Sequence, residues 1–139
     1  MATLQESYIQ TTTKREALKQ VLAWFDQFQQ TPVPHQVWLQ CQLALIEGFT
    51  NALRHAHEGL PAETPIQIKV VLSPQAIDIQ IWDQGPGFDL ETVLKRKMAT
   101  TTSESEGGRG LKIMRTVADV LTYQRTSDHR NCLHIQKRY

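Results

Sequence analysis

The stretch PIQIKVVLSPQAIDIQIW, residues 65–82, decides the class of fold. On either side of Ser73-Pro74-Gln75, isoleucine, valine and leucine alternate with more polar residues. Strict alternation is typical of strands with one buried face, and two such runs around a short turn form an antiparallel hairpin. The sequence therefore predicts strands at residues 65–72 and 76–82, with one face of the hairpin in the core.

The segments that flank the hairpin predict helices that can cover its apolar face. Hydrophobic residues recur at helical spacing in residues 14–30, 35–58 and 109–119. Helices combined with hairpins are typical of α+β folds. We expect a single domain over residues 1–139, a two-layer α/β sandwich with helices on one face of a mixed, mostly antiparallel sheet. The other predicted elements are a strand at 4–12, a short helix at 90–97, a polar loop at 98–108, and strands at 120–126 and 131–138.

The composition excludes several classes of protein. Lysine and arginine number 15 against 14 aspartates and glutamates, a formal charge of +1, which argues against a protein built mainly to neutralise nucleic-acid phosphates. The cysteines, Cys41 and Cys132, form no CxxC pair, so we expect neither a zinc site nor a disulfide framework. The sequence shows no apolar run of about 20 residues and no signal peptide. We therefore expect a cytoplasmic protein.

The first segment that carries chemistry is EGFTN, residues 47–51, in the predicted second helix. Four residues advance an α-helix by about 400°, so Glu47 and Asn51 lie on one stripe, one turn apart, and His55 continues it. Apolar residues flank the stripe, and buried polar groups need partners. The segment is either the polar edge of an amphipathic helix or a carboxylate beside an oxygen ligand for a hard cation such as Mg²⁺.

The second segment, DQGPG at residues 83–87, directly follows the second strand of the hairpin. Asp83 places a carboxylate at the end of a mostly buried strand, and Gly85 and Gly87 allow backbone angles and close approaches that a Cβ atom forbids. The spacing differs from a dinucleotide-binding fingerprint because the third glycine is missing. By itself the pattern fits a simple turn or a ligand-binding loop.

The third segment, GGRGL at residues 107–111, opens the predicted third helix. A glycine-rich helix start presents free N–H groups and the positive end of the helix dipole, which suits a phosphate group. A flexible hinge before a helix is the alternative interpretation. The chain contains no GxxxxGK[ST] sequence, so the segment is not a P-loop.

The three segments together are more specific than any one of them. Glu-x-x-x-Asn on a helix, Asp-x-Gly-x-Gly after a strand and Gly-x-Gly-Leu at a helix start resemble, in this order, the nucleotide-binding boxes of the GHKL ATPase superfamily. The resemblance covers roughly residues 35–125. Within the superfamily the chain is most similar to the anti-sigma serine/threonine kinases, also called anti-sigma regulatory factors, because EGFTNALRH resembles their characteristic helix and the segment between Phe88 and Gly107 is short.

The resemblance implies roles for individual residues. Asn51 would coordinate the Mg²⁺ ion that bridges the nucleotide phosphates, and Glu47 would act as general base toward the attacking hydroxyl group. Asp83 would accept a hydrogen bond from the adenine amino group, which favours ATP over GTP. The family's strand threonine near adenine has no unique match, and Thr122 is one candidate. The expected backbone contacts are Gly85 and Gly87 beneath the nucleotide, and Gly108, Arg109, Gly110 and Leu111 at its phosphates.

The resemblance also implies a partner-switching kinase. The expected substrate is a serine or threonine of a STAS-domain anti-anti-sigma protein, a sigma factor or other output protein is the second expected partner, and a homodimer is expected. The alternative is a non-catalytic module that binds a nucleotide or sequesters a sigma factor. Glu47 beside Asn51 favours the kinase, because a binding module needs no base. A detached histidine-kinase catalytic domain is a third interpretation, which the short lid and the lack of an acceptor-helix segment weigh against.

Overall fold

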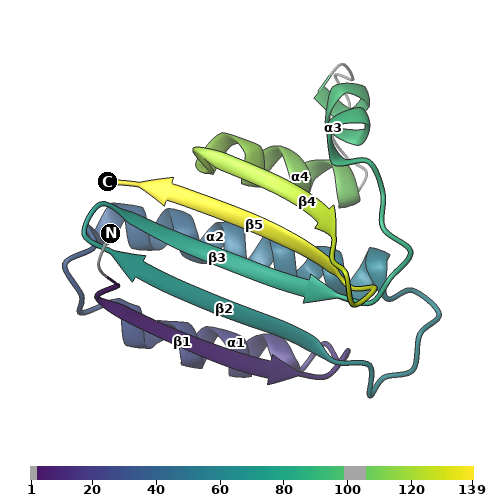
Figure 1. Ribbon diagram of the computed structural model, residues 1–139, viewed down its shortest axis with the longest axis horizontal. Helices are drawn as coiled ribbons and strands as arrows, with labels where there is room; N and C mark the ends of the chain where they lie inside the picture. The colour runs from purple at the N-terminus through teal and green to yellow at the C-terminus, as the bar shows by residue number, and fades with distance from the viewer. Residues whose placement is uncertain (1–2, 99–105) are drawn as a thin grey trace.

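The computed structural model describes residues 3–98 and 106–139 of the chain, so most of the predicted polar loop at 98–108 lies outside the described residues. None of the described helices is long and apolar enough to cross a membrane. The elements follow the predicted order closely (Figure 1). They are β1 (Gln5–Thr11), α1 (Ala17–Phe25), the 3₁₀ turn η1 (Asp26–Phe28), α2 (His35–Asn51), the π-helical turn η2 (Ala52–Ala56), β2 (Ile66–Ser73), β3 (Ala76–Asp83), α3 (Leu90–Met98), α4 (Glu106–Val117), β4 (Val120–Arg125) and β5 (Asn131–Arg138).

The strands form one five-stranded sheet with the order β1-β2-β3-β5-β4. All of its neighbouring strands are antiparallel, so the sheet is antiparallel throughout rather than mixed. The hairpin predicted from residues 65–82 forms its centre, and its register pairs Val70 with Ile79, which in turn pairs with Ile135 of β5. All three side chains are buried, so the predicted alternation corresponds to a continuous apolar row across the sheet.

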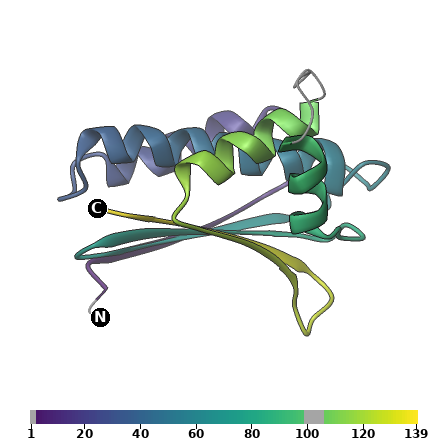
Figure 2. The ribbon, with the colours of Figure 1, turned by 90° about the horizontal axis from the view of Figure 1, so that it is seen from above.

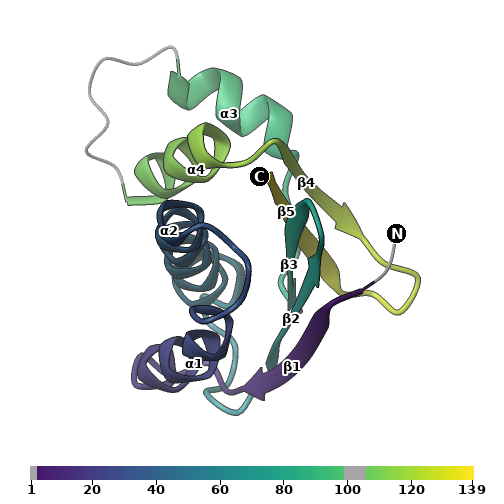
Figure 3. The same ribbon diagram turned by 90° about the vertical axis from the view of Figure 1, so that its left-hand side faces the viewer.

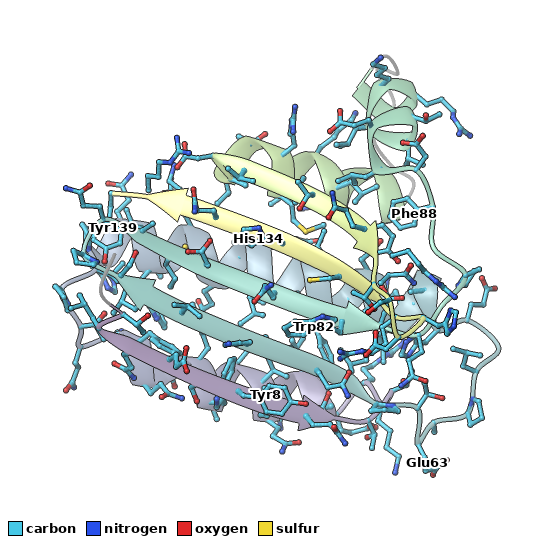
Figure 4. The ribbon with its side chains drawn as sticks, in the orientation of Figure 1. Tyr8, Glu63, Trp82, Phe88, His134 and Tyr139 are labelled. Carbon is cyan, nitrogen blue, oxygen red and sulfur yellow. The ribbon has the colours of Figure 1, made fainter. Side chains whose placement is uncertain are left out.

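Helices α1, α2 and α4 cover one face of the sheet, which confirms the predicted two-layer α/β sandwich (Figures 2 and 3). The side chains between the layers form the core. The opposite face carries the more polar residues of each strand, and Tyr8, Trp82 and His134 lie on it (Figure 4). The largest fully buried side chains include Phe25, Phe28, Phe49, Ile68, Ile79, Met114 and Ile135.

Gly48 explains how closely α2 lies on the sheet. A Cβ atom built there would meet Ile81 Cδ1 at 2.6 Å and Leu133 Cδ2 at 3.2 Å. Because the helix rests on β3 and β5 at this residue, its neighbours Glu47 and Asn51 are carried to the same end of the sheet as the carboxyl end of β3. The glycine inside EGFTN is thus a packing residue.

Several helix boundaries differ from the prediction: α1 is shorter than the predicted 14–30 and is followed by the 3₁₀ turn η1. Two other differences concern the segments that carry chemistry. The α-helical part of α2 ends at Asn51, and the predicted continuation to residue 58 is a π-helical turn that closes with a hydrogen bond from His57 N to Ala52 O, 3.0 Å long. The α-helical spacing that placed His55 on the stripe of Glu47 and Asn51 therefore does not apply there. Helix α4 begins at Glu106 instead of residue 109, because the glycines counted as loop in the sequence are helical in the structure.

Candidate functional site

Asp83, the last residue of β3, is the centre of a buried hydrogen-bond network at the end of the sheet. Its side chain is 2 % exposed. Oδ1 accepts hydrogen bonds from Asn131 Nδ2 at 2.8 Å and from the backbone N–H of Gly85 at 2.9 Å, and Oδ2 accepts one from the Tyr123 hydroxyl at 2.8 Å. An ionised carboxylate has about four acceptor sites, so one site on Oδ2 is left after these bonds. The carboxylate is therefore held in one orientation and can accept one further donor.

Asn131 links the Asp83 carboxylate to the turn that follows it. It is the register partner of Asp83 at the start of β5 and is 2 % exposed. Its Nδ2 also donates to Gly85 O at 2.9 Å, and Arg125 Nη1 donates to the same carbonyl at 3.0 Å. The first residue of β5 thus bonds to Asp83, whereas Thr122 of β4, the candidate from the sequence, is the register partner of His134. The only indication of this residue in the sequence was an asparagine at the start of a predicted strand, and asparagine is also common in ordinary turns.

Tyr123 on β4 completes the network from the other side. Burial, and then the negative charge of Asp83, raise the pKa of its phenol above the usual range, so the hydroxyl stays protonated and donates to the carboxylate. Its ring stacks on Phe88, with ring centroids 4.5 Å apart; Phe88 is labelled in Figure 4. Tyr123 also lines an open hollow between β4 and the start of α3, to which Glu47, Asn51 and Asp83 do not contribute. Nothing in the periodicity of residues 120–126 distinguished this tyrosine.

The two glycines of the DQGPG turn are required by close contacts. A Cβ atom at Gly85 would lie 2.2 Å from the backbone oxygen of Ala56, the last residue of the π-helical turn. Gly87 has a φ of +81°, and a Cβ atom there would lie 2.8 Å from Asn131 Oδ1. The first glycine lets the end of α2 and η2 dock on the turn, and the second lets the turn pass beside Asn131.

Glu47 and Asn51 lie one turn apart on the α-helical part of α2, as the sequence predicted, and both side chains are half-buried. A Cβ atom at Gly110 of α4 would lie 2.8 Å from Glu47 Oε1, so the glycine-rich segment meets the carboxylate directly. No three His, Cys, Asp or Glu side chains of residues 3–98 and 106–139 gather as a metal site. A cation beside Asn51 would therefore take most of its ligands from a bound nucleotide and water, a coordination that suits Mg²⁺.

Helix α4 places the residues of the third segment in two different environments. Because the helix begins at Glu106, its N–H groups without an intrahelical acceptor are those of its first three residues, of which Gly108 is the last. Arg109, Gly110 and Leu111 lie further in, where the N–H groups bond within the helix. Leu111 is buried in the core and Arg109 is exposed. The start of α4 can therefore offer N–H groups and a positive dipole end to an anion, while Gly110 contributes clearance.

The amino-acid sequence is similar to one known protein family and to several curated proteins. The family described as the histidine kinase-like ATPase domain matches residues 11–137. The serine-protein kinase RsbW of Bacillus pumilus is 28% identical over 92 residues, or 62% of this chain and 57% of that protein. The anti-sigma F factor of Thermoanaerobacter sp. (strain X514) is 31% identical over 84 residues, or 60% and 57%. These alignments cover little more than half the length of either relative.

Comparison with solved structures agrees on the fold. A chain in the crystal structure of the SiaB-SiaC complex from Pseudomonas aeruginosa superposes with a TM-score of 0.65 over 99% of this chain and 91% of that chain. The sequence identity is 11%, so this likeness concerns the fold alone.

Proposed function

The chain belongs to the histidine kinase-like ATPase domain family, and we propose that it is an ATP-dependent serine/threonine protein kinase of the anti-sigma type. The observation that carries the proposal is that three segments far apart in sequence meet at one end of the sheet. The close approach of Ala56 to Gly85 joins the end of α2 to the Asp83 turn, and that of Gly110 to Glu47 joins α4 to α2. The relatives named serine-protein kinase and anti-sigma F factor support the same assignment.

The described residues fit an adenine nucleotide. The acceptor site left on Asp83 Oδ2 suits the amino group of adenine and repels the carbonyl that guanine has at the matching position. The clearances at Gly85 and Gly87 shape the turn beneath the base, and the start of α4 provides the N–H of Gly108 and the positive charge of Arg109 for phosphate oxygens. The amide oxygen of Asn51 suits a Mg²⁺ ion on those phosphates. When bound, Mg²⁺-ATP supplies the phosphoryl group that is transferred.

Glu47 is the proposed general base. Phosphoryl transfer needs a group that takes the proton of the attacking hydroxyl, and a half-buried carboxylate one helical turn from the proposed Mg²⁺ ligand is suitably placed for it. Gly110 holds the backbone of α4 against Glu47 Oε1 without a side chain between them. The carboxylate therefore lies at the junction of α2 and α4.

The proposed phospho-acceptor is a serine or threonine of a STAS-domain protein, and the proposed second partner is a sigma factor or another output protein of a partner-switching circuit. The printed name of one relative, anti-sigma F factor, supports the second partner. We also propose a homodimer in the cytoplasm and a single domain over the whole chain.

Titration calorimetry with ATP, with and without Mg²⁺, and with GTP as the control tests the nucleotide site. We expect Mg²⁺-dependent binding that prefers ATP. Asn51→Ala should abolish the Mg²⁺-dependent part, whereas Gln36→Ala, which removes an exposed amide at the other end of α2, should leave it unchanged. Unchanged ATP affinity in Asn51→Ala would sink the metal role.

Transfer of radiolabelled phosphate from ATP to purified STAS-domain proteins tests the kinase activity. Glu47→Gln should bind ATP normally and transfer phosphate at least about 100-fold more slowly, because general-base catalysis contributes roughly that factor. Glu16→Gln, an exposed carboxylate at the start of α1, is the control. If the native protein binds ATP and a partner but transfers no phosphate, the non-catalytic sequestering module replaces the kinase.

A further inference from the structure

We infer that His57 is a positioning residue of the nucleotide site, which, with Thr13 as its partner, holds the backbone N–H of Gln84 and thereby the turn after Asp83. The inference rests on the proposed function, since it assigns the histidine a part in ATP binding. His57 directly follows the π-helical turn and is 2 % exposed.

A continuous row of hydrogen bonds runs through the imidazole. The backbone N–H of Gln84 donates to His57 Nε2 at 2.8 Å. His57 Nδ1 lies 2.7 Å from Thr13 Oγ1, and the Thr13 hydroxyl donates to the backbone oxygen of Thr64 at 2.6 Å. Both ring nitrogens are therefore engaged, one with the turn after Asp83 and one with Thr13, which lies between β1 and α1.

The direction of every bond in this row follows from the two ends. A backbone N–H can only donate, so Nε2 of His57 must be the unprotonated nitrogen, and Nδ1 must carry the hydrogen of the neutral ring. The Thr13 oxygen must then accept from Nδ1, which is possible because its own hydrogen is already given to Thr64 O. Thr13 thus selects the tautomer that leaves Nε2 free to accept from Gln84.

The π-helical turn brings His57 to this place. Its closing bond from His57 N to Ala52 O spans one residue more than an α-helical bond, which changes the direction in which the chain leaves the helix. Ala56 O then packs on Gly85, while His57 contacts Gln84. Two consecutive residues at the end of η2 therefore hold two consecutive residues of the turn.

A movement of this turn reaches the base-reading carboxylate directly. The N–H of Gly85 donates to Asp83 Oδ1, so a displacement of the peptide at Gln84 alters a bond of the carboxylate itself. Burial lowers the pKa of His57, an effect that the negative charge of Asp83 partly offsets, so the ring is neutral at pH 7, as its acceptor role requires. We expect loss of the imidazole acceptor to loosen the Asp83 turn.

The tautomer and the Gln84 amide can be measured in the nucleotide-free protein by NMR. Long-range ¹H–¹⁵N correlation spectra should show His57 protonated at Nδ1 and unprotonated at Nε2, and the Gln84 amide should exchange slowly with solvent. In Thr13→Val the Gln84 amide should exchange faster, whereas in Thr31→Val, which also removes a hydroxyl bonded to a backbone carbonyl but at the other end of α2, it should not. A His57 ring protonated at Nε2 would overturn the inference.

Calorimetry of ATP binding then tests the role in the site. His57→Phe keeps an aromatic ring without an acceptor and should bind ATP about tenfold more weakly, the effect of one unsatisfied buried N–H. His57→Gln restores an acceptor and should recover most of the affinity. The ATP affinity of Thr13→Val should lie between those of His57→Phe and His57→Gln. Thr13→Val therefore tests the inference even if His57→Phe does not fold.

The outcomes separate this inference from the proposed function. Normal ATP binding by the native protein together with native affinity in Thr13→Val and His57→Phe overturns the inference and leaves the kinase proposal intact. No ATP binding by the native protein sinks the proposed function and the binding role of His57 with it, whatever tautomer the NMR spectra show.

Discussion

The two ends of the proposed nucleotide site are built by different means. At the end that would read the base, Asp83 is held by side-chain and backbone donors from β4, β5 and the DQGPG turn. The end that would hold the phosphates is formed by the start of α4 and by the close approach of Glu47 to Gly110, which has no side chain. Hydrogen bonds between elements define the first region, and clearance between two helices defines the second.

Because the two ends are built differently, substitutions in them should affect different properties of the protein. Bonds in a buried network contribute to folding, and a lost partner leaves a buried group unsatisfied. A glycine that makes room for a flexible carboxylate contributes little to folding but determines where that carboxylate lies. Substitutions at the base end should therefore lower the free energy of unfolding, while substitutions at the phosphate end should mainly lower the rate of transfer.

The largest effect is expected at the contact between Gly85 and Ala56. In Gly85→Ala the Cβ atom would lie 2.2 Å from a backbone oxygen, which no rotamer change relieves. We expect a loss of about 3 kcal/mol in the free energy of unfolding, measured by urea denaturation. Gly59→Ala, at a φ of +81° with no atoms within 4 Å of the new Cβ, should cost about 1 kcal/mol from backbone strain alone. Equal losses in the two variants would contradict the proposed docking contact.

A smaller effect is expected for Asn131→Ala. This change leaves Asp83 Oδ1 and Gly85 O each with one donor fewer in a buried place, at a cost of about 2 kcal/mol in unfolding free energy. Gln136→Ala removes a similar amide-to-carboxylate bond, with Asp78, on the face that the helices leave uncovered. Solvent can replace that bond, so a loss of about 0.5 kcal/mol is expected. A Gln136→Ala loss as large as that of Asn131→Ala would argue against a special network at Asp83.

Gly110→Ala, at the phosphate end, should lower the free energy of unfolding less than Gly85→Ala or Asn131→Ala does at the base end. The new Cβ atom meets the far end of the Glu47 side chain, which can move aside, so we expect less than about 1 kcal/mol of destabilisation. The displaced carboxylate should lower the phosphoryl-transfer rate by about tenfold with ATP affinity preserved. A transfer rate equal to that of the native protein, measured with saturating ATP, would show that the position of Glu47 is not critical.

The smallest effect concerns pH. Because the pKa of His57 is lowered in the folded protein, the unfolded chain takes up its proton first, as the pH falls below the ordinary value of 6.5. The folded state therefore loses stability from that pH downward, until the pH reaches the lowered pKa. Urea denaturation at pH 7.5 and 5.5 should show a smaller acid-dependent loss in His57→Gln than in the native protein. His35→Gln, an exposed histidine, should behave as the native protein does.

Much of the fold could be predicted from local patterns. The hairpin, the helices and the last strand pair follow from periodicity, because a buried face imposes its spacing on the residues that line it. The two boundaries that failed in the segments that carry chemistry have a common cause. The π-helical turn after Asn51 and the early start of α4 depend on what these segments pack against, and neither changes the spacing of apolar residues in a recognisable way.

The sequence by itself determined the order of elements, the stripe of Glu47 and Asn51, and the placing of Asp83 and its glycines between a strand and a helix. These are local properties, set by helical and strand repeats and by the conformations that glycine allows. Only the tertiary structure decided the partners of Asp83, namely Asn131 and Tyr123, and the contacts of Gln84 with His57 and of Glu47 with Gly110. Each of these contacts joins two different elements or turns, at least 27 positions apart in the chain, through directional hydrogen bonds or steric clearance. Such contacts depend on how the layers pack and leave no periodic signal in the sequence.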